Sequence, residues 1–307
     1  MFKLIQSFLF LIFIATTPVR GDCFDNLIKK SEISLGYTYR QDDIKFKFEN
    51  SVLGFSDEQI QTFEQVKIQQ ATFLAKFITC NKLYFRGKGD YGWIFDGHTH
   101  HTDEIAIFSS KQKSCLSDDC VFDLSGGVGY ALDCGCGTGF TFVPMFGYSW
   151  NRQDLSASSW KIASDTLFEL KPGTSLHCLK RSYLTSWFGP WLGFDIILDY
   201  FCEWKLFFEF EYHWPDYEAT FIGREAKIGQ ITIHSRHRDD CGFGQGYCGS
   251  IGVKSDCCGN WFWYAMGGFQ SWNIDHGRGK STNGELHDLS FVDWTSYQGT
   301  IGFGIDF

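Results

Sequence analysis

The chain has 307 residues, of which 18% are aromatic, 33 are glycine and only 5 are proline. With a mean hydropathy of -0.17, this composition is typical of an all-β protein that has many large apolar side chains but no long apolar block. A formal net charge of -9 argues against the basic surface that nucleic-acid binding requires, so we expect no nucleic-acid partner.

The first 21 residues have the features of a cleaved secretory signal peptide. Lys3 precedes an apolar run from Phe8 to Ala15, and a small residue, Gly21, stands at the expected cleavage point. The apolar run is too short to span a membrane as a helix. We therefore expect an exported protein with a signal peptide at residues 1–21 and one mature domain at residues 22–307.

Ten later segments alternate large apolar residues with small, polar or charged ones. A repeat of two residues is the pattern of a β-strand with two different faces. The predicted strands lie at about residues 33–40, 64–79, 83–93, 122–132, 140–150, 183–199, 204–214, 243–253, 261–273 and 289–307. The stretch 44–59 follows the pattern loosely and is interpreted as a long connection, which could hide part of a strand or a short helix.

In the strands 83–93 and 204–214 the charged residues lie on one face only. In the strand 204–214, for example, Phe208 and Phe210 alternate with Glu209 and Glu211. This separation suits a barrel whose outside meets lipid, where a basic side chain at the midplane would cost about 2–4 kcal/mol. We therefore predict that the lumen is lined by Arg86, Lys88, Asp90, Asp195, Lys205, Glu209, Glu211 and His213.

The connections alternate between short turns and long loops after the first strand. Residues 94–119, 151–178, 215–240 and 274–288 are predicted as the long loops. Tight periplasmic turns, longer external loops and an even strand count are typical of a bacterial outer-membrane protein. The predicted fold is an all-β, closed antiparallel transmembrane barrel of about ten strands in the Gram-negative outer membrane, with its lipid as a partner.

Twelve cysteines in an exported chain indicate an oxidising compartment, where disulfides form. Local bridges, such as Cys115 with Cys120, are one interpretation, and crosslinks to other envelope proteins at the periplasmic rim are the other. Adjacent or closely spaced cysteines are difficult to pair with each other because a disulfide needs a particular geometry. The disulfide candidates are Cys23, Cys80, Cys115, Cys120, Cys134, Cys136, Cys178, Cys202, Cys241, Cys257 and Cys258.

Four short motifs occur in an order that resembles the Protochlamydia outer membrane protein family. They are Gly89 to Phe95 (GDYGWIF), Gly189 to Asp195 (GPWLGFD), Phe210 to Trp214 (FEYHW) and Trp272 to Arg278 (WNIDHGR). The resemblance covers most of the chain beyond about residue 60. It implies an outer-membrane barrel with porin-like activity, in bacteria whose envelopes are tied together by disulfides.

The ten-strand layout also looks like that of the omptins, which are outer-membrane proteases. Omptin chemistry needs two carboxylates in Asp-x-Asp spacing before a Trp, and an Asp-His pair on the facing wall. Here Asp90 matches the first carboxylate, but Gly92 stands at the second position before Trp93, and no His follows Asp216. We therefore expect no enzyme activity and no catalytic residues, and we interpret Asp90 as a lumen residue that pairs with a nearby base.

His98, His100 and His101 are weak candidates for a metal site. Imidazole and neighbouring carboxylates are ligands that zinc or copper accepts. A loop without a rigid scaffold seldom fixes the geometry of a metal site, so a solvated surface loop is the favoured interpretation. We expect neither a metal nor another cofactor.

Three functions remain open at this point. The first is a narrow or gated pore for small solutes, because wide aqueous channels need about 16–18 strands. The second is a structural or surface-adhesion barrel without transport, and the third is an omptin-like protease.

Overall fold

The computed structural model describes residues 28–307, apart from 53–54, 106–107, 117–118, 134–138, 166–170, 177–180, 202–203, 224–225, 229–230, 234–235, 258 and 282–285. The predicted signal peptide lies outside the described residues. Among the described residues, no helix is long and apolar enough to cross a membrane.

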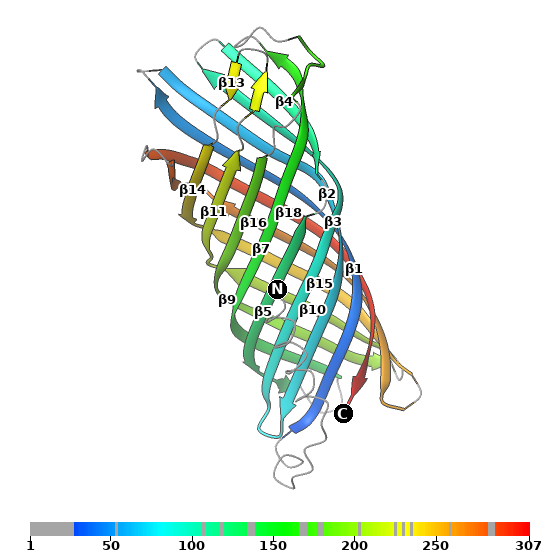
Figure 1. The fold of residues 1–307 in the computed structure, drawn as a ribbon. Helices are drawn as coiled ribbons and strands as arrows, with labels where there is room; N and C mark the ends of the chain where they lie inside the picture. Colours follow the sequence, from blue (N-terminus) through cyan, green and yellow to red (C-terminus); the bar gives the residue numbers. More distant parts are fainter. Residues whose placement is uncertain are drawn as a thin grey trace, which may run out of the picture.

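Ten antiparallel strands form a closed ring, which confirms the predicted barrel (Figure 1). Each strand is hydrogen-bonded to the next one, and the last strand pairs with the first over the register Glu32 with Asp306 to Glu49 with Asp288. In order round the ring, the strands are β1 (Ile28–Val52), β2 (Phe55–Thr79), β3 (Leu83–Ile105), β5 (Cys120–Tyr130), β7 (Phe140–Asp165), β9 (Arg181–Phe201), β10 (Trp204–His213), β15 (Gln245–Asp256), β16 (Trp261–Ile274) and β18 (Leu286–Asp306).

The ring continues beyond the predicted strands, into segments that the sequence had suggested were loops. Four further strands continue the positions of β5, β10, β15 and β16, and they are β4 (Phe108–Leu116), β11 (Asp216–Gly223), β14 (Arg236–Phe243) and β17 (Gly277–Ser281). The loop assignments for residues 94–119, 151–178, 215–240 and 274–288 were therefore largely wrong. Residues 44–59 are also strand, because β1 and β2 pair up to Val52 and Phe55.

The polarity of the two faces reverses along these long strands, which explains why the extension was missed. In β1, Leu35 and Tyr37 are exposed on the outer face, whereas Phe46 and Phe48 are buried in the interior. A repeat of two residues persists throughout, but its apolar side points outward in the membrane part and inward above it. We call the part above the reversal the extracellular extension.

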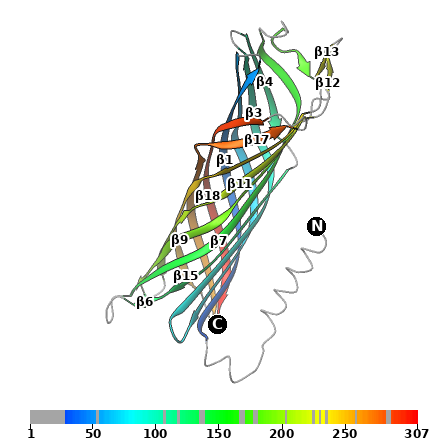
Figure 2. The ribbon, with the colours of Figure 1, turned by 90° about the vertical axis from the view of Figure 1, so that its left-hand side faces the viewer.

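Four short strands complete the described part of the chain. β6 (Leu132–Asp133) and β8 (Ser175–Leu176) pair with β7, while β12 (Ala226–Ile228) and β13 (Ile231–Ile233) form a separate hairpin. This hairpin and β4 lie at the upper end of the barrel, and the C-terminus lies at the opposite end (Figure 2). The β2–β3 and β15–β16 turns therefore lie at the periplasmic end.

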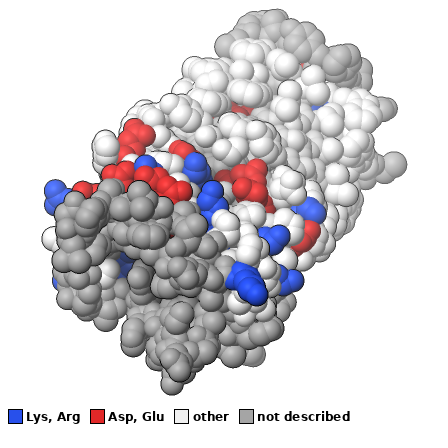
Figure 3. Space-filling view, turned by 90° about the horizontal axis from the view of Figure 1, so that it is seen from above, with Lys and Arg blue, Asp and Glu red and all other residues white. Residues whose placement is uncertain are grey.

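The outer surface of the membrane part is apolar. Ile251, Ile301 and Phe303 are 65%, 66% and 57% exposed. Phe208 and Phe210 lie on the same face and contact Phe194, with ring centroids 5.9 and 5.7 Å apart. In the view from above, charged residues gather at the near end, whereas the receding flank is almost uncharged (Figure 3). These side chains face lipid, as a membrane-spanning barrel requires.

Candidate functional site in the barrel interior

The interior of the extracellular extension is filled by a hydrophobic core. Trp187, Trp272 and Trp294 are completely or almost completely buried, and the rings of Trp272 and Trp294 stack with centroids 5.6 Å apart and an interplanar angle of 13°. Above them, Phe46 packs on Tyr183 at 4.3 Å. Side chains in such a core fill space at nearly the density of a crystal. This part of the barrel is therefore solid.

Below the aromatic core, Arg40 forms the first polar layer. Its guanidinium contacts Asp42 at 2.6 Å and also pairs with Asp123 from the facing wall. Gln153 donates a hydrogen bond of 2.6 Å to the same carboxylate of Asp42, and the guanidinium lies 5.1 Å from the ring of Trp294. The charge of Arg40 is thus fully paired inside the barrel, as a buried charge must be.

The next polar layer is centred on Arg86, one of the predicted lumen residues. Arg86 pairs with Asp195 and Glu211, and Glu209 lies 3.6 Å away. Lys76 contacts Glu209 at 2.7 Å from the opposite side. Strands β2, β3, β9 and β10 supply these groups, so the network links both sides of the ring.

Lys88 and Asp90 lie between these two layers. They contact each other at 3.3 Å, and Thr72 donates a hydrogen bond of 2.5 Å to the second oxygen of Asp90. Thr72 is itself joined to Thr38, at 2.6 Å. The lumen residue Asp90 is therefore held by hydrogen bonds and an ion pair within a structural network.

Lys205 is separate from the other predicted lumen residues. It pairs with Asp256 at 2.7 Å near the periplasmic end. There it lines a cavity of about 370 Å³, together with Lys30, Lys82, Lys254 and Tyr264. The cavity lies below the Arg86 layer.

Sequence reasoning missed several members of the interior network. Arg40, Asp42, Lys76 and Asp123 are not among the predicted lumen residues, yet all four take part in the interior ion pairs. The alternation that identified Glu209 and Glu211 also applies to the residues Thr38, Arg40 and Asp42 of β1. The signal was therefore present, but the cross-barrel pairing depends on the strand order round the ring.

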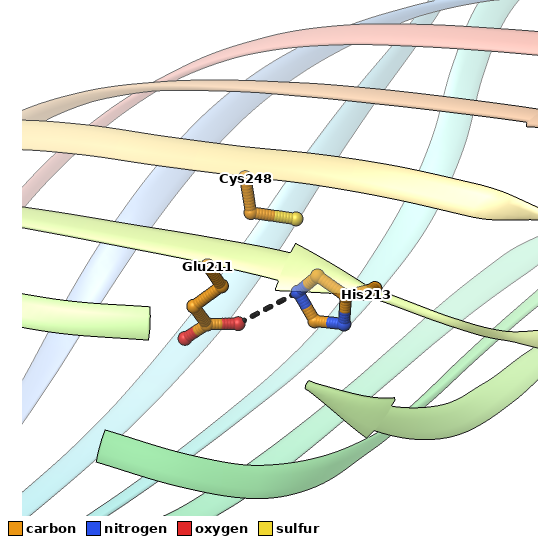
Figure 4. A group of neighbouring side chains, drawn as sticks. All are labelled: Glu211, His213 and Cys248. Atoms are coloured by element: carbon orange, nitrogen blue, oxygen red, sulfur yellow. Dashed lines mark ion pairs between the residues drawn. The ribbon is translucent and has the colours of Figure 1, made fainter. Parts of the chain in front are cut away.

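Glu211, His213 and Cys248 form a compact group of possible metal ligands inside the barrel (Figure 4). One ligand atom of each residue lies within 4.8 Å of the others. The Nε2 atom of His213 is 2.9 Å from Glu211, and its Nδ1 atom is 3.0 Å from the hydroxyl of Ser149. A cavity of about 70 Å³ adjoins the three residues. The sequence prediction placed Glu211 and His213 in the lumen but assigned no metal site to them.

The three histidines that were weak metal candidates do not converge. His98 is exposed on the outer face of β3, and His100 lies on that same face, 3.6 Å from Glu64. His101 points inward, where it contacts Gln61 and Asp103 at 2.9 Å each. The three side chains therefore do not meet at one point, and the expected solvated surface loop is instead part of strand β3.

The described cysteines are all free thiols. They are Cys80, Cys115, Cys120, Cys241, Cys248 and Cys257. The suggested bridge between Cys115 and Cys120 is absent, because Cys115 lies opposite His98 in the sheet whereas Cys120 lies opposite Trp93. The other disulfide candidates, Cys23, Cys134, Cys136, Cys178, Cys202 and Cys258, lie outside the described residues.

The positions that were compared with the omptin site do not form paired carboxylates. A Cβ atom at Gly92 would lie 2.5 Å from the side chain of Gln70, so the packing leaves no space for a second Asp. Asp216 and Glu218 are exposed on the outer face of β11, whereas Tyr217 between them points inward. These two acids therefore face away from Asp90.

Comparisons with known proteins agree with this fold. A family model described as Protochlamydia outer membrane protein matches residues 34–307. The crystal structure of the outer membrane protease OmpT from Escherichia coli superposes with a TM-score of 0.71 at 10% sequence identity, covering 91% of this chain and 97% of that one. At such low identity the likeness shows the fold alone.

Two other solved structures match more weakly. The Pseudomonas putida toluene transporter TodX has a TM-score of 0.33 at 8% identity, covering 91% of this chain and 90% of that chain. The translocator domain of the autotransporter NalP from Neisseria meningitidis has a TM-score of 0.31 at 9% identity, covering 90% of this chain and 88% of that chain. No curated protein matches the sequence.

Proposed function

We propose, from the premise that this chain belongs to the Protochlamydia outer membrane protein family, that it is a closed structural barrel which holds its extracellular extension at the cell surface. Its place is the bacterial outer membrane. Of the three functions left open by the sequence, the structural or surface-adhesion barrel is the first candidate and the small-solute pore is the second.

The filled interior is the observation that carries this proposal. A solute crossing the barrel would have to displace the stacked tryptophans Trp272 and Trp294, and then the ion-paired layers of Arg40 and Arg86. Opening one buried ion pair costs about 3–5 kcal/mol when a partner is left uncompensated. A permanently open path is therefore not supported by this geometry.

Conductance across a planar lipid bilayer tests the proposal. We expect no stable conductance steps from the purified, folded barrel, under conditions in which a known open porin gives them. Folding is checked by the difference in electrophoretic mobility between heated and unheated samples. Reproducible conductance steps that scale with the amount of folded protein would support the pore instead.

A gated pore is the second candidate because the periplasmic end is hollow. The cavity of about 370 Å³ is lined by lysines that are paired with acids, such as Lys205 with Asp256, so it is a polar chamber without a marked preference for one charge. A gated pore would conduct only when the stacked tryptophans and both arginine layers move aside. Conductance steps that are absent at low voltage and appear reversibly at higher voltage would support this candidate, whereas no steps at any voltage would count against it.

We also propose that the protein contributes to a disulfide-linked envelope. The free thiols of Cys80 and Cys257 are exposed in turns at the periplasmic end, and the oxidising conditions outside the inner membrane favour disulfides. Non-reducing electrophoresis of native envelopes should then show high-molecular-mass species that reductant converts to monomer. Only monomer in non-reduced samples would contradict this role.

Omptin-like proteolysis remains the third candidate, and we propose that the barrel is not an enzyme. The burial of Asp90 in a hydrogen-bonded network and the outward orientation of Asp216 support this view. Cleavage of dibasic peptides by the folded barrel, lost in Asp90→Asn, would contradict it.

A further inference from the structure

We propose that Glu211, His213 and Cys248 bind a divalent transition-metal ion, of which Zn²⁺ is the best match, inside the barrel. The three side chains supply a carboxylate oxygen, an imidazole nitrogen and a thiolate sulfur. Zn²⁺ accepts all three ligand types, whereas Mg²⁺ and Ca²⁺ prefer oxygen alone. This inference does not depend on whether the barrel is open or closed.

The backbone itself brings the three residues together. Glu211 on β10 lies directly opposite Cys248 on β15 in the register of the two strands. His213 follows Glu211 by two residues and therefore points to the same, inner face. The group in Figure 4 thus occupies one face of a two-stranded ribbon, within a closed ring that restricts its movement. The histidines of segment 98–101 also lie on a paired strand, but their side chains point to opposite faces of the sheet.

One ring nitrogen of His213 has no hydrogen bond. Its Nε2 atom is buried and lies 2.9 Å from Glu211, but it has no partner in hydrogen-bond geometry. The other nitrogen, Nδ1, is 3.0 Å from the Ser149 hydroxyl, which can fix the orientation of the ring. Metal-binding histidines usually have such a partner on their second nitrogen. The orientation leaves Nε2 to face Glu211 and Cys248.

The carboxylate of Glu211 is also held in place by a neighbouring side chain. One of its oxygens pairs with Arg86, and the other faces His213. The neighbouring cavity of about 70 Å³ is larger than the roughly 10–15 Å³ that one water molecule needs. A water in this cavity can supply the fourth position of a tetrahedral zinc ion that has three protein ligands.

The charge of the surrounding network also favours a cation. Six carboxylates and four basic side chains make up the two polar layers and the pair between them, which gives a formal charge of -2 at neutral pH. The acids are Asp42, Asp90, Asp123, Asp195, Glu209 and Glu211, and the bases are Arg40, Lys76, Arg86 and Lys88. Buried charge that is not compensated is costly, and a divalent ion would offset most of this excess, because the thiolate of Cys248 that binds it adds one negative charge and leaves a formal charge of -1.

Titration with Co²⁺, a spectroscopic substitute for Zn²⁺, tests the site in the folded barrel in detergent. We expect one equivalent to bind, with visible bands of a tetrahedral ion and a thiolate-to-cobalt charge-transfer band in the near ultraviolet, and Zn²⁺ should displace it. Cys248→Ser should lose the charge-transfer band. The matched control Cys241→Ser removes an exposed thiol and should keep it. Ser149→Ala should weaken binding about 10–100-fold.

The opposite pattern would overturn the proposal. A wild-type barrel without the charge-transfer band, or a band that survives in Cys248→Ser and disappears in Cys241→Ser, would show that the metal binds elsewhere or not at all. X-ray absorption of the zinc-loaded Cys241→Ser barrel provides a test that does not require the Cys248 variant to fold. One sulfur at about 2.3 Å, with nitrogen and oxygen at about 2.0–2.2 Å, is expected, and a shell with no sulfur or with several would contradict the site.

Discussion

The guanidinium of Arg40 on β1 forms an ion pair with the carboxylate of Asp123 on β5, and both side chains are buried. The two strands are not neighbours in the sheet, because β2 and β3 lie between them in the ring. The pair therefore crosses the interior and connects two parts of the wall that share no backbone hydrogen bonds. Asp42 holds the same guanidinium from a second side.

Replacing Arg40 by Met should strongly destabilise the barrel. The substitution leaves Asp42 and Asp123 buried without their common partner, and breaking a buried pair in this way costs about 3–5 kcal/mol. Urea-induced unfolding in lipid vesicles, followed by tryptophan fluorescence, measures the change. The control Lys82→Met removes the exposed pair with Asp133, 3.1 Å long, and should cost only about 0–1 kcal/mol. Equal losses in the two variants would argue against the cross-barrel role of Arg40.

Trp187→Ala tests whether the extension is held by its aromatic core. Trp187 contacts Tyr217, Trp272 and Trp294 with ring centroids 4.6, 5.8 and 6.1 Å apart. Removing this ring leaves a cavity, so we expect a loss of about 3–5 kcal/mol, measured by the same unfolding experiment. Trp93→Ala removes a ring of equal size from the outer surface and creates no internal cavity, so its effect should be clearly smaller. A similar loss at both positions would contradict the packed core.

The stability of the extracellular extension should fall as the pH decreases below about 6.5, the ordinary pKa of histidine. Burial lowers the pKa of His101 in the folded protein, and the nearby charge of Arg181 lowers it further, although Asp103 opposes both. The unfolded state therefore binds a proton at a higher pH than the folded state does, and acid favours unfolding. Hydrogen exchange of the extension at several pH values measures the effect.

His101→Gln should weaken this pH dependence, because the glutamine does not titrate. The matched variant His100→Gln changes a partly exposed histidine on the outer face and should leave the dependence unchanged. If His100→Gln alone removed the acid sensitivity, the assignment to His101 would be wrong.

Ile301→Lys tests the lipid-facing surface. Ile301 lies in the membrane part of β18 and is 66% exposed. A lysine near the membrane midplane should reduce the free energy of folding into a bilayer by about 2–4 kcal/mol. Leu286→Lys introduces the same charge at the start of β18, where the side chain is 78% exposed in the extension, and should have little effect. A tolerated lysine at position 301 would contradict the proposed orientation.

The membrane part of the fold could be predicted from the sequence because lipid imposes a simple rule on it. The face that meets lipid must carry apolar residues, such as Ile301 and Phe303. Charged residues, such as Glu209 and Glu211, must therefore lie on the inner face. The extension could not be predicted in the same way, since the rule reverses there: Phe46 and Trp294 point inward, as in a water-soluble protein. Both regions have the same two-residue repeat. The pattern therefore predicts the strands, but not whether their outer face meets lipid or water.

The interior groups were predictable as individuals but not as pairs. Alternation placed Arg86 and Glu211 on the inner face, but their contact depends on which strands face each other across the ring. Cys248 is a similar case. Its place opposite Glu211 requires the register of β10 and β15, which no local pattern provides.

The pairing of β1 with β18 also constrains how the protein is made. The first and last strands of the chain share one long seam, so the ring has no closed form until the C-terminal residues have been synthesised and exported. Until then, the free edge of β1 has to be shielded by something other than the finished wall. Closure of the ring must therefore follow export of the last strand, and a chain that is truncated before β18 should leave the barrel open along β1.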